Sequence, residues 1–358
     1  MNNIYTYFFI LFDGCRFPFG HGGEVALHYM MRDHGGFEGN GQTFRIVAHL
    51  EPFSEHFGMN LTRRTLLGLI KYPQIMGKLQ QASSAKLPDS FRQLKADKWH
   101  PPKGLYLDDM DMINWVLSPL SQQDKALFQQ FKTKDNHHSK TIYKSIDCSM
   151  MELADDIAYG IHDLEDAIVT GVVNQQDFNQ HVIQKLLKVD DTWLQDYSKT
   201  LADNLFSNQR YIQKEAIGGL VNYLITAIEL VDINKTKNVN FEEPLLRFNA
   251  VHPIIAAQTL QIFKDFVYQF VIKQTSIQQL EYRGQQIVME LFEALASDPE
   301  RLLPKSTVKR WQQAQENNQN QHRVIADYVA GMTDEYATRL YQTLFLPIGQ
   351  TGFGKHDY

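Results

Sequence analysis

Apolar residues recur every three or four positions along most of this chain, and that spacing is typical of helices with one buried face. The pattern predicts helices over 60–70, 110–117, 124–132, 148–168, 176–187, 192–205, 216–231, 254–272, 276–296 and 323–345. No segment shows the strict alternation of apolar and polar residues that a half-buried strand requires. We therefore predict an all-α fold.

Three segments interrupt the helical pattern and are predicted to contain loops. Glycine is dense over residues 20–42, on both sides of a short apolar helical run, which indicates backbone that approaches another group closely. The tract 132–140 is polar and is predicted to be an exposed loop. Its adjacent His137 and His138 could bind a metal ion, but neighbours in sequence do not face the same way on a regular element, so a solvated loop is favoured. The glutamine-rich tract 312–321 is predicted to be a connector between the last two helices.

The predicted helix over 148–168 carries acids next to a face that looks buried. Asp155, Tyr159 and Asp163 stand at i, i+4 and i+8 and would share one side of a regular helix. Carboxylates beside a core need a partner, and a hard metal ion, a sugar hydroxyl or a basic side chain would each serve. Tyr159, with the small Gly160 beside it, suits a ring lying against a flat ligand better than a solvated surface.

Composition narrows the class of protein. The chain has 358 residues, of which 43% are apolar, enough for one large helical domain or two packed lobes. A formal charge of −6 argues against a generally basic surface for nucleic acid. Two cysteines form no metal-binding Cys-x-x-Cys pair and favour a reducing cytoplasm. The apolar run 7–12 is too short to span a bilayer, so we expect no membrane association.

Five longer motifs in the chain resemble those of a known family. They are FPFGHGGE at 17–24, GGFEGNGQTFRI at 35–46, MNLTRRTLLGLIKYP at 59–73, LADDIAYGIHDLEDA at 153–167 and DYVAGMTDEYA at 327–337. Together, and in this order, they resemble the dGTPase-like deoxynucleoside triphosphate triphosphohydrolases of the HD-domain superfamily. The resemblance begins near residue 17, which divides the chain into a divergent segment 1–16 and a phosphohydrolase domain 17–358.

The resemblance implies a helical HD-domain phosphohydrolase fold, here without the family's N-terminal helices. It implies that a divalent cation, Mg²⁺ or Mn²⁺, binds a deoxynucleoside triphosphate, which is hydrolysed to deoxynucleoside and tripolyphosphate. Members of the family assemble, so a homo-oligomer is expected. Single-stranded nucleic acid is a partner that the motifs neither require nor exclude.

The resemblance also assigns roles to particular residues. His21 and Glu24 match the catalytic pair, spaced to meet on the first turn of a helix, although a histidine capping a turn and a first-turn acid would look alike. Tyr159 matches the tyrosine that lies under the sugar and excludes a 2′-hydroxyl, and Asp163 matches the acid facing the 3′-hydroxyl. The other matches are the metal aspartates Asp13 and Asp155 and the phosphate contacts Asn40, Lys71, Tyr72 and Lys103.

One motif departs from the family. The pattern HDIGHPPFGHGGE is replaced here by FDGCRFPFGHGGE, so Phe12 and Arg16 stand at histidine positions while Asp13 is kept. A further metal histidine that the family carries upstream has no counterpart either. We expect the missing imidazoles to weaken metal binding. A shifted reading frame, a misplaced start or a genuinely divergent N-terminus would each explain the segment.

Three functions follow from these observations. The first is a deoxynucleoside triphosphate triphosphohydrolase-like protein from which we expect little or no turnover. The second is a catalytically inactive relative that binds nucleotide or associates with intact subunits. The third, an HD phosphodiesterase acting on another phosphoester, is disfavoured because Tyr159 and the two lysine segments suit a deoxynucleoside triphosphate.

Overall fold

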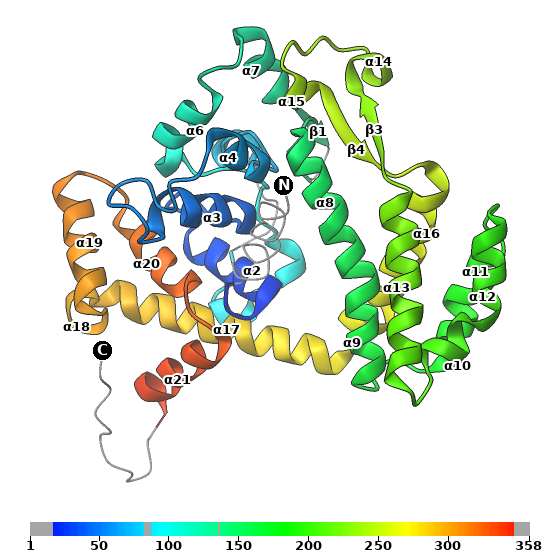
Figure 1. Ribbon diagram of the computed structural model, residues 1–358. Helices are drawn as coiled ribbons and strands as arrows, with labels where there is room; N and C mark the ends of the chain where they lie inside the picture. The colour runs from blue at the N-terminus through cyan, green and yellow to red at the C-terminus, as the bar shows by residue number, and fades with distance from the viewer. Residues whose placement is uncertain (1–16, 82–86, 135–136, 347–358) are drawn as a thin grey trace.

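The computed structural model describes residues 17–81, 87–134 and 137–346, and helices dominate this part of the chain (Figure 1). The mainly helical fold predicted from the apolar spacing is confirmed. Buried side chains gather in three apolar cores, one formed by both ends of the described chain and two by its middle. The predicted segment 1–16, with Asp13, lies outside the described residues.

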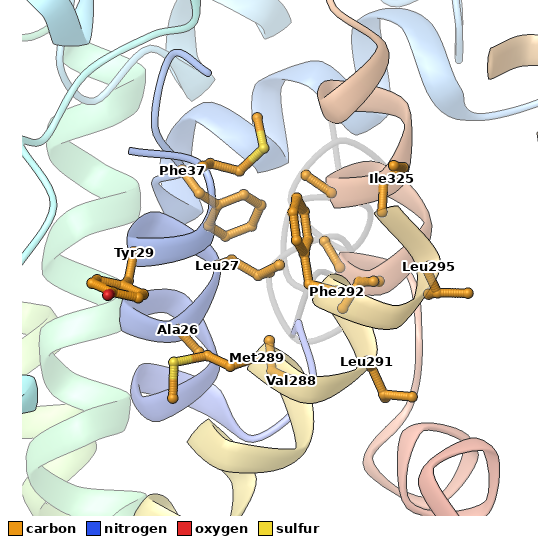
Figure 2. Close-up of a cluster of buried hydrophobic side chains, with 14 of the residues drawn as sticks. Ala26, Leu27, Tyr29, Phe37, Val288, Met289, Leu291, Phe292, Leu295 and Ile325 are labelled. Atoms are coloured by element: carbon orange, nitrogen blue, oxygen red, sulfur yellow. The ribbon is translucent and has the colours of Figure 1, made fainter. Parts of the chain in front are cut away.

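The first core joins the earliest described helix to the last ones. Its elements are α2 (Gly20–Met30), η2 (Phe91–Gln93), η3 (Ala96–Lys98), α17 (Thr275–Ser297), α18 (Pro299–Leu302), α19 (Lys305–Glu316), α20 (Gln321–Ala330) and α21 (Asp334–Phe345). Leu27 of α2 and Phe37 meet Val288 and Phe292 of α17, with Ile325 of α20 beside them (Figure 2). The long helix α17 thus forms a base on which α2 lies (Figure 1).

The second core is formed mainly by residues 44–143, with Ile233, Phe241 and Leu246 added from later in the chain. Its elements are α3 (Gly39–Arg45), η1 (Ile46–Leu50), α4 (Arg63–Leu69), α6 (Met110–Leu117), α7 (Gln122–Phe128), α8 (Ile146–Ile157), α14 (Ile233–Lys237) and α15 (Pro244–Arg247). Between α4 and α6 the chain also forms α5 (Met76–Leu79), whose Met76 packs in the first core, and η4 (Leu107–Asp109). The side chain of Thr62 caps α4 by accepting the N–H of Thr65.

The third core is built by helices that follow α8. They are η5 (Ala158–His162), α9 (Asp163–Val169), α10 (Gln175–Phe178), η6 (Asn179–Ile183), α11 (Gln184–Leu186), α12 (Thr192–Leu205), α13 (Arg210–Thr226), α16 (Ile254–Val267) and η7 (Tyr268–Ile272). The long, nearly vertical α8 connects this group to the rest of the molecule (Figure 1). No helix in the described ranges is long and apolar enough to cross a membrane.

Two short antiparallel pairs of strands depart from the predicted helices and loops. β1 (Phe131–Lys134) pairs with β2 (His137–Thr141), so the tract expected to be an exposed loop is largely a hairpin. β3 (Glu229–Asp232) pairs with β4 (Phe248–Val251), with Glu229 opposite Val251. Both pairs are held by backbone hydrogen bonds between strands with little apolar alternation, which is why the sequence pattern missed them.

Two helix boundaries also differ from the prediction. The predicted helix over 323–345 is two helices, because α20 ends at Ala330 and α21 begins at Asp334 after a turn at Gly331. The glutamine-rich connector is shorter than expected, since α19 continues to Glu316. Glutamine is a good helix former, so a polar run does not by itself end a helix.

Candidate active site

The first turn of α2 presents His21 at the surface. Phe19, the residue before the helix, has a φ of 61°, a left-handed conformation that is rare for a bulky side chain. The N–H of Phe19 donates to Oδ1 of Asp334 at 2.8 Å, which ties this turn to α21. A Cβ at Gly22 would lie 2.8 Å from the backbone oxygen of Glu281, so glycine is what allows α2 to approach α17 closely.

His21 and Glu24 form the contact that their spacing predicts. Nδ1 of His21 lies 3.0 Å from Oε2 of Glu24, with the histidine side chain 51% exposed and the glutamate side chain 6% exposed. The hydrogen bond to Glu24 raises the pKa of His21. Burial opposes ionisation of Glu24, but bonds from His21, Lys103 and the Gly39 amide outweigh it and lower the pKa of Glu24 to about 2. The pair therefore combines a fixed carboxylate with an imidazole that is readily protonated.

Lys103 lies between two buried carboxylates. Its Nζ is 2.9 Å from Oε1 of Glu24 and 3.2 Å from Oε1 of Glu38, which is completely buried. The side-chain amide of Asn40 donates to the same Glu38 oxygen at 2.7 Å. Burial opposes the charge on Lys103, yet the two carboxylates raise the pKa of that ammonium. Two of the four predicted phosphate contacts, Lys103 and Asn40, thus have their polar ends on protein carboxylates.

Glu38 is a site residue that sequence reasoning missed. It caps α3, where Oε2 accepts the N–H of Gly41 at 2.8 Å. An acid directly before the helical segment that starts at Gly39 was a signal that could have identified this cap. Its contact with Lys103 joins residues far apart in the chain, and no local pattern indicates it.

Two histidines that the sequence did not single out for this site lie close to His21. The ring of His100 stacks on that of His21, with the ring centroids 5.4 Å apart and the planes inclined by 19°. Nε2 of His138 donates to the carbonyl oxygen of His100 at 3.1 Å, and Nδ1 of His138 accepts the N–H of Gln81 at 3.1 Å. Burial lowers the pKa of both His100 and His138. His138 is therefore a structural link rather than a solvated loop residue.

A second charged group follows one side of α8. Nζ of Lys71 lies 3.7 Å from Oε1 of Glu152 and 3.9 Å from Oδ2 of Asp155, and Lys144 forms a further ion pair with Glu152. Burial is the largest cause that raises the pKa of Asp155, and Lys71 opposes that effect.

Tyr72 connects the two groups. Burial, together with the charge on Glu38, raises the pKa of its phenol, while Lys103 opposes that effect and Glu152 on α8 adds to it. Tyr72 therefore lies within electrostatic range of the carboxylates around α3 and of those on α8. Direct contacts link the same segments: Lys71 faces Asp155 on α8 at 3.9 Å, and the N–H of Met76 donates to the carbonyl of Leu105, two residues after Lys103.

The acidic helix contains a π-helical turn that the sequence did not predict. η5 begins directly after α8 and holds Tyr159, and the N–H of Asp163 bonds to the carbonyl of Ala158 five residues back. The π turn contains one extra residue. By helix geometry, Asp163 is therefore expected at the angular position that the seventh residue after Asp155 has in a regular helix, about 20° away from Asp155 around the helix axis. That Asp155, Tyr159 and Asp163 share one side of the helix stays a prediction.

The Tyr159 side of this helix is also held by α16. Nζ of Lys264 lies 2.6 Å from Oδ1 of Asp156 and 6.0 Å from the centre of the Tyr159 ring. Burial and the charge of Asp163 raise the pKa of Tyr159. The phenol therefore keeps its proton at neutral pH.

The described residues do not by themselves fit a resident metal ion. In the ranges given above, no group of three or more histidine, cysteine, aspartate or glutamate side chains is arranged to hold one. Asp155 brings a single carboxylate that already faces Lys71. Asp13, the other predicted metal aspartate, lies outside the described residues.

Comparison with known proteins agrees with the fold and with the motifs. A family model described as a phosphohydrolase-associated domain matches residues 250–343. A deoxyguanosinetriphosphate triphosphohydrolase-like protein of Aliivibrio fischeri is 54% identical over 334 residues, which cover 92% of this chain and 75% of that protein. Proteins of the same description from Shewanella pealeana and Shewanella loihica are 55% and 56% identical over 92% of this chain, and 73% and 74% of their own lengths are covered. The chain belongs to the family of deoxyguanosinetriphosphate triphosphohydrolase-like proteins.

Proposed function

We propose that this chain binds deoxynucleoside triphosphates beside Lys71 and Tyr72, between the His21 turn and the Asp155 face of α8, in a site of the triphosphohydrolase type. The observation that carries the proposal is a chain of contacts through segment 71–76: Lys71 faces Asp155 on α8 at 3.9 Å, and the N–H of Met76 donates to the carbonyl of Leu105 at 3.0 Å. Two residues before Leu105, Lys103 contacts Glu24 at 2.9 Å. On this proposal, the catalytic and sugar-binding candidates from three distant segments would border one region. Membership of the family supports the class of ligand.

The ligand would replace contacts that the protein makes with itself. Lys71 faces the carboxylates of Glu152 and Asp155 at 3.7 and 3.9 Å, distances at which a phosphate can compete for the ammonium. The sugar would lie against the ring of Tyr159, which leaves no room for a 2′-hydroxyl, and Asp163 would accept a hydrogen bond from the 3′-hydroxyl.

The His21 and Glu24 pair would supply proton transfer. In hydrolysis to deoxynucleoside and tripolyphosphate, water adds to the α-phosphorus and the bond from phosphorus to the 5′-oxygen breaks. That oxygen leaves as a poor leaving group unless it is protonated, and protonated His21 can donate a proton from Nε2 while Nδ1 remains on Glu24 at 3.0 Å. A divalent cation would stabilise charge on the phosphates in such a reaction.

A second candidate is a nucleotide-binding protein with little turnover. It is favoured by the small number of side chains available to bind a divalent cation. Asp155 is paired with Lys71, and Phe12 and Arg16 stand at positions that hold histidines in the family pattern. Few donors make for weak cation binding, and one ammonium cannot neutralise a triphosphate. We therefore expect binding of dGTP with slow hydrolysis from this chain.

The test measures binding and turnover separately. Calorimetry with dGTP and with GTP gives affinity, and anion-exchange chromatography detects tripolyphosphate in Mg²⁺ or Mn²⁺. We expect dGTP to bind more tightly than GTP, Lys71→Met to weaken dGTP binding about tenfold or more, and the exposed-lysine control Lys78→Met to leave it unchanged. Tripolyphosphate formation that is lost on His21→Ala would establish the hydrolase and rule out the second candidate. The absence of dGTP binding would overturn both.

A further inference from the structure

His21 is held on one edge by a carboxylate and on its flat face by another imidazole. Nδ1 meets Oε2 of Glu24, which fixes one point of the ring but leaves rotation about χ1 and χ2 to be restrained by packing. The ring of His100 lies parallel to it within 19°, at a centroid distance of 5.4 Å. This offset, nearly parallel contact restrains the tilt of a side chain that is otherwise half exposed.

His100 is itself held by a residue from a different part of the chain. Its backbone carbonyl accepts a hydrogen bond from Nε2 of His138, on β2, at 3.1 Å. The other ring nitrogen of His138 accepts the N–H of Gln81 at 3.1 Å. A neutral ring protonated on Nε2 satisfies both bonds, so the hairpin β1–β2 fastens the segment that carries His100 and Lys103.

We propose that His100 is a positioning residue for His21, holding the His21 imidazole in the orientation in which Nδ1 meets Glu24, with His138 fixing His100 through its carbonyl. The inference rests on the proposed role of His21 in proton transfer and deepens it. It extends the site to the segment that carries His100 and Lys103 and to the hairpin β1–β2, neither of which holds a predicted catalytic residue.

The charges around the two rings suit a stack of one protonated and one neutral imidazole. Charged groups from three segments lie near His21: Glu24 on its own helix, Glu281 on α17, and Lys103 on the segment that also carries His100. Their net effect raises the pKa of His21. Burial is the main cause that lowers the pKa of His100, with His21 and Lys103 acting in the same direction and Glu24 and Asp97 opposing it. Near neutral pH the stack therefore avoids placing two cations face to face, and neighbouring groups with separated pKa values are the arrangement expected where proton transfer is tuned.

The experiment follows the titration of the His21 ring by NMR, assigned with a His21→Ala variant, in the nucleotide-free protein. In the unaltered chain we expect a pKa above 6.5. His100→Ala frees the His21 ring from Glu24 and should lower its pKa by about 0.5 unit or more. His100→Phe restores a flat surface without a titrating group and should return the pKa of His21 to its original value. The exposed neighbour variant His137→Ala is the matched control and should change nothing.

Two further comparisons keep the inference open to refutation. If His100→Ala does not fold, His138→Ala keeps the His100 ring but breaks its anchor, and the pKa of His21 should still fall. An unchanged His21 titration in His100→Ala, or in His138→Ala where that variant is used, or a failure of His100→Phe to restore it, would overturn the inference. Because no nucleotide is added, a failure of dGTP binding would overturn the proposed function without affecting this result.

Discussion

Several charged residues in this site are stabilised by close ion pairs that are shielded from solvent. Lys103 lies between Glu24 and Glu38, and both carboxylates are shielded from water. Removing one partner from such a group leaves an uncompensated buried charge, which is far more destabilising than the loss of a surface ion pair. Lys103 is therefore as much a part of the framework that holds Glu24 as it is a candidate for contact with phosphate.

His28, on the buried side of α2, makes the free energy of unfolding depend on pH. Its side chain is buried, Nδ1 accepts the N–H of Phe37 at 3.3 Å, and burial lowers its pKa from 6.5 to about 4. The unfolded chain takes up a proton below pH 6.5 while the folded chain does not until about pH 4. The free energy of unfolding should therefore fall as pH decreases through this window, by about 3 kcal/mol from this residue.

Urea unfolding at a series of pH values measures this effect. His28→Asn keeps an acceptor for Phe37 but does not titrate, so its free energy of unfolding should fall less steeply between pH 6.5 and 4. The exposed His56→Asn is the control and should keep the original slope. Equal slopes for His28→Asn and the unaltered chain would contradict the assignment.

The residues of the site differ in how well the sequence could predict them. His21 and Glu24 meet because they are three positions apart on one helix, which is local information. The contacts of Glu38 with Lys103 and of His100 with His21 join segments more than sixty residues apart, and no periodicity reports them. The sequence predicts a solvated loop at His138, since adjacent histidines do not face one ligand, whereas in the fold both ring nitrogens of His138 are hydrogen-bonded.

At the scale of elements, the close approach of α2 to α17 determines where the His21 turn lies. A Cβ at Gly22 would meet Cγ of Glu281 at 2.7 Å and its backbone oxygen at 2.8 Å. The backbone oxygen cannot swing aside as the end of a side chain can. A larger residue must therefore push one helix away from the other.

We expect Gly22→Ala to lower the free energy of unfolding by about 1–3 kcal/mol. Gly218 on α13 is the matched control, because it is exposed and a Cβ there would meet nothing within 4 Å. Gly218→Ala should stabilise the protein by about 0.5–1 kcal/mol through the better helix propensity of alanine. Chemical denaturation of both variants tests the pair, and a neutral Gly22→Ala would show that the helices can separate without loss.

The elements were predictable where apolar spacing is regular and were missed where tertiary contacts decide. α12 begins and ends at the predicted residues, because its buried positions repeat at helical spacing. The π turn of η5 depends on packing, since Gly160 lies against Leu260 of α16. The strands β1 and β2 are mostly polar, and their pairing is set by backbone bonds that leave no pattern in the side chains.

At the scale of the whole molecule, the two ends of the described chain are joined by buried ion pairs as well as by the first core. Arg45 on α3 donates to both carboxylate oxygens of Asp327 on α20, at 2.9 Å for each pair of Nε with Oδ1 and Nη2 with Oδ2. Arg323 is buried and donates from Nε to Asp108 at 3.0 Å. The C-terminal helices therefore complete the part of the molecule that holds the His21 turn.

We expect residues 250–343, the range that matches the phosphohydrolase-associated domain, not to fold alone. Val288, Met289 and Phe292 of α17 are buried in the core shared with α2, so the isolated segment would expose an apolar face (Figure 2). Calorimetry of this fragment should show no cooperative transition, and it should bind the dye ANS strongly. Residues 17–346 under the same conditions provide the comparison, and a sharp transition from the fragment would refute the expectation.

The hydrogen bond from the N–H of Phe19 to Asp334 connects α21 to the turn that precedes α2, at the other end of the described chain. A residue keeps an unfavourable backbone conformation, such as the left-handed one of Phe19, only where surrounding contacts stabilise it. Here one such contact is the hydrogen bond to the carboxylate of Asp334 at the start of α21. If that helix frays, this hydrogen bond is lost and Phe19 can relax, and the turn bearing His21 unwinds with it. Local melting of α21 would thus change the position of His21, the proposed proton donor, more than three hundred residues away in the chain.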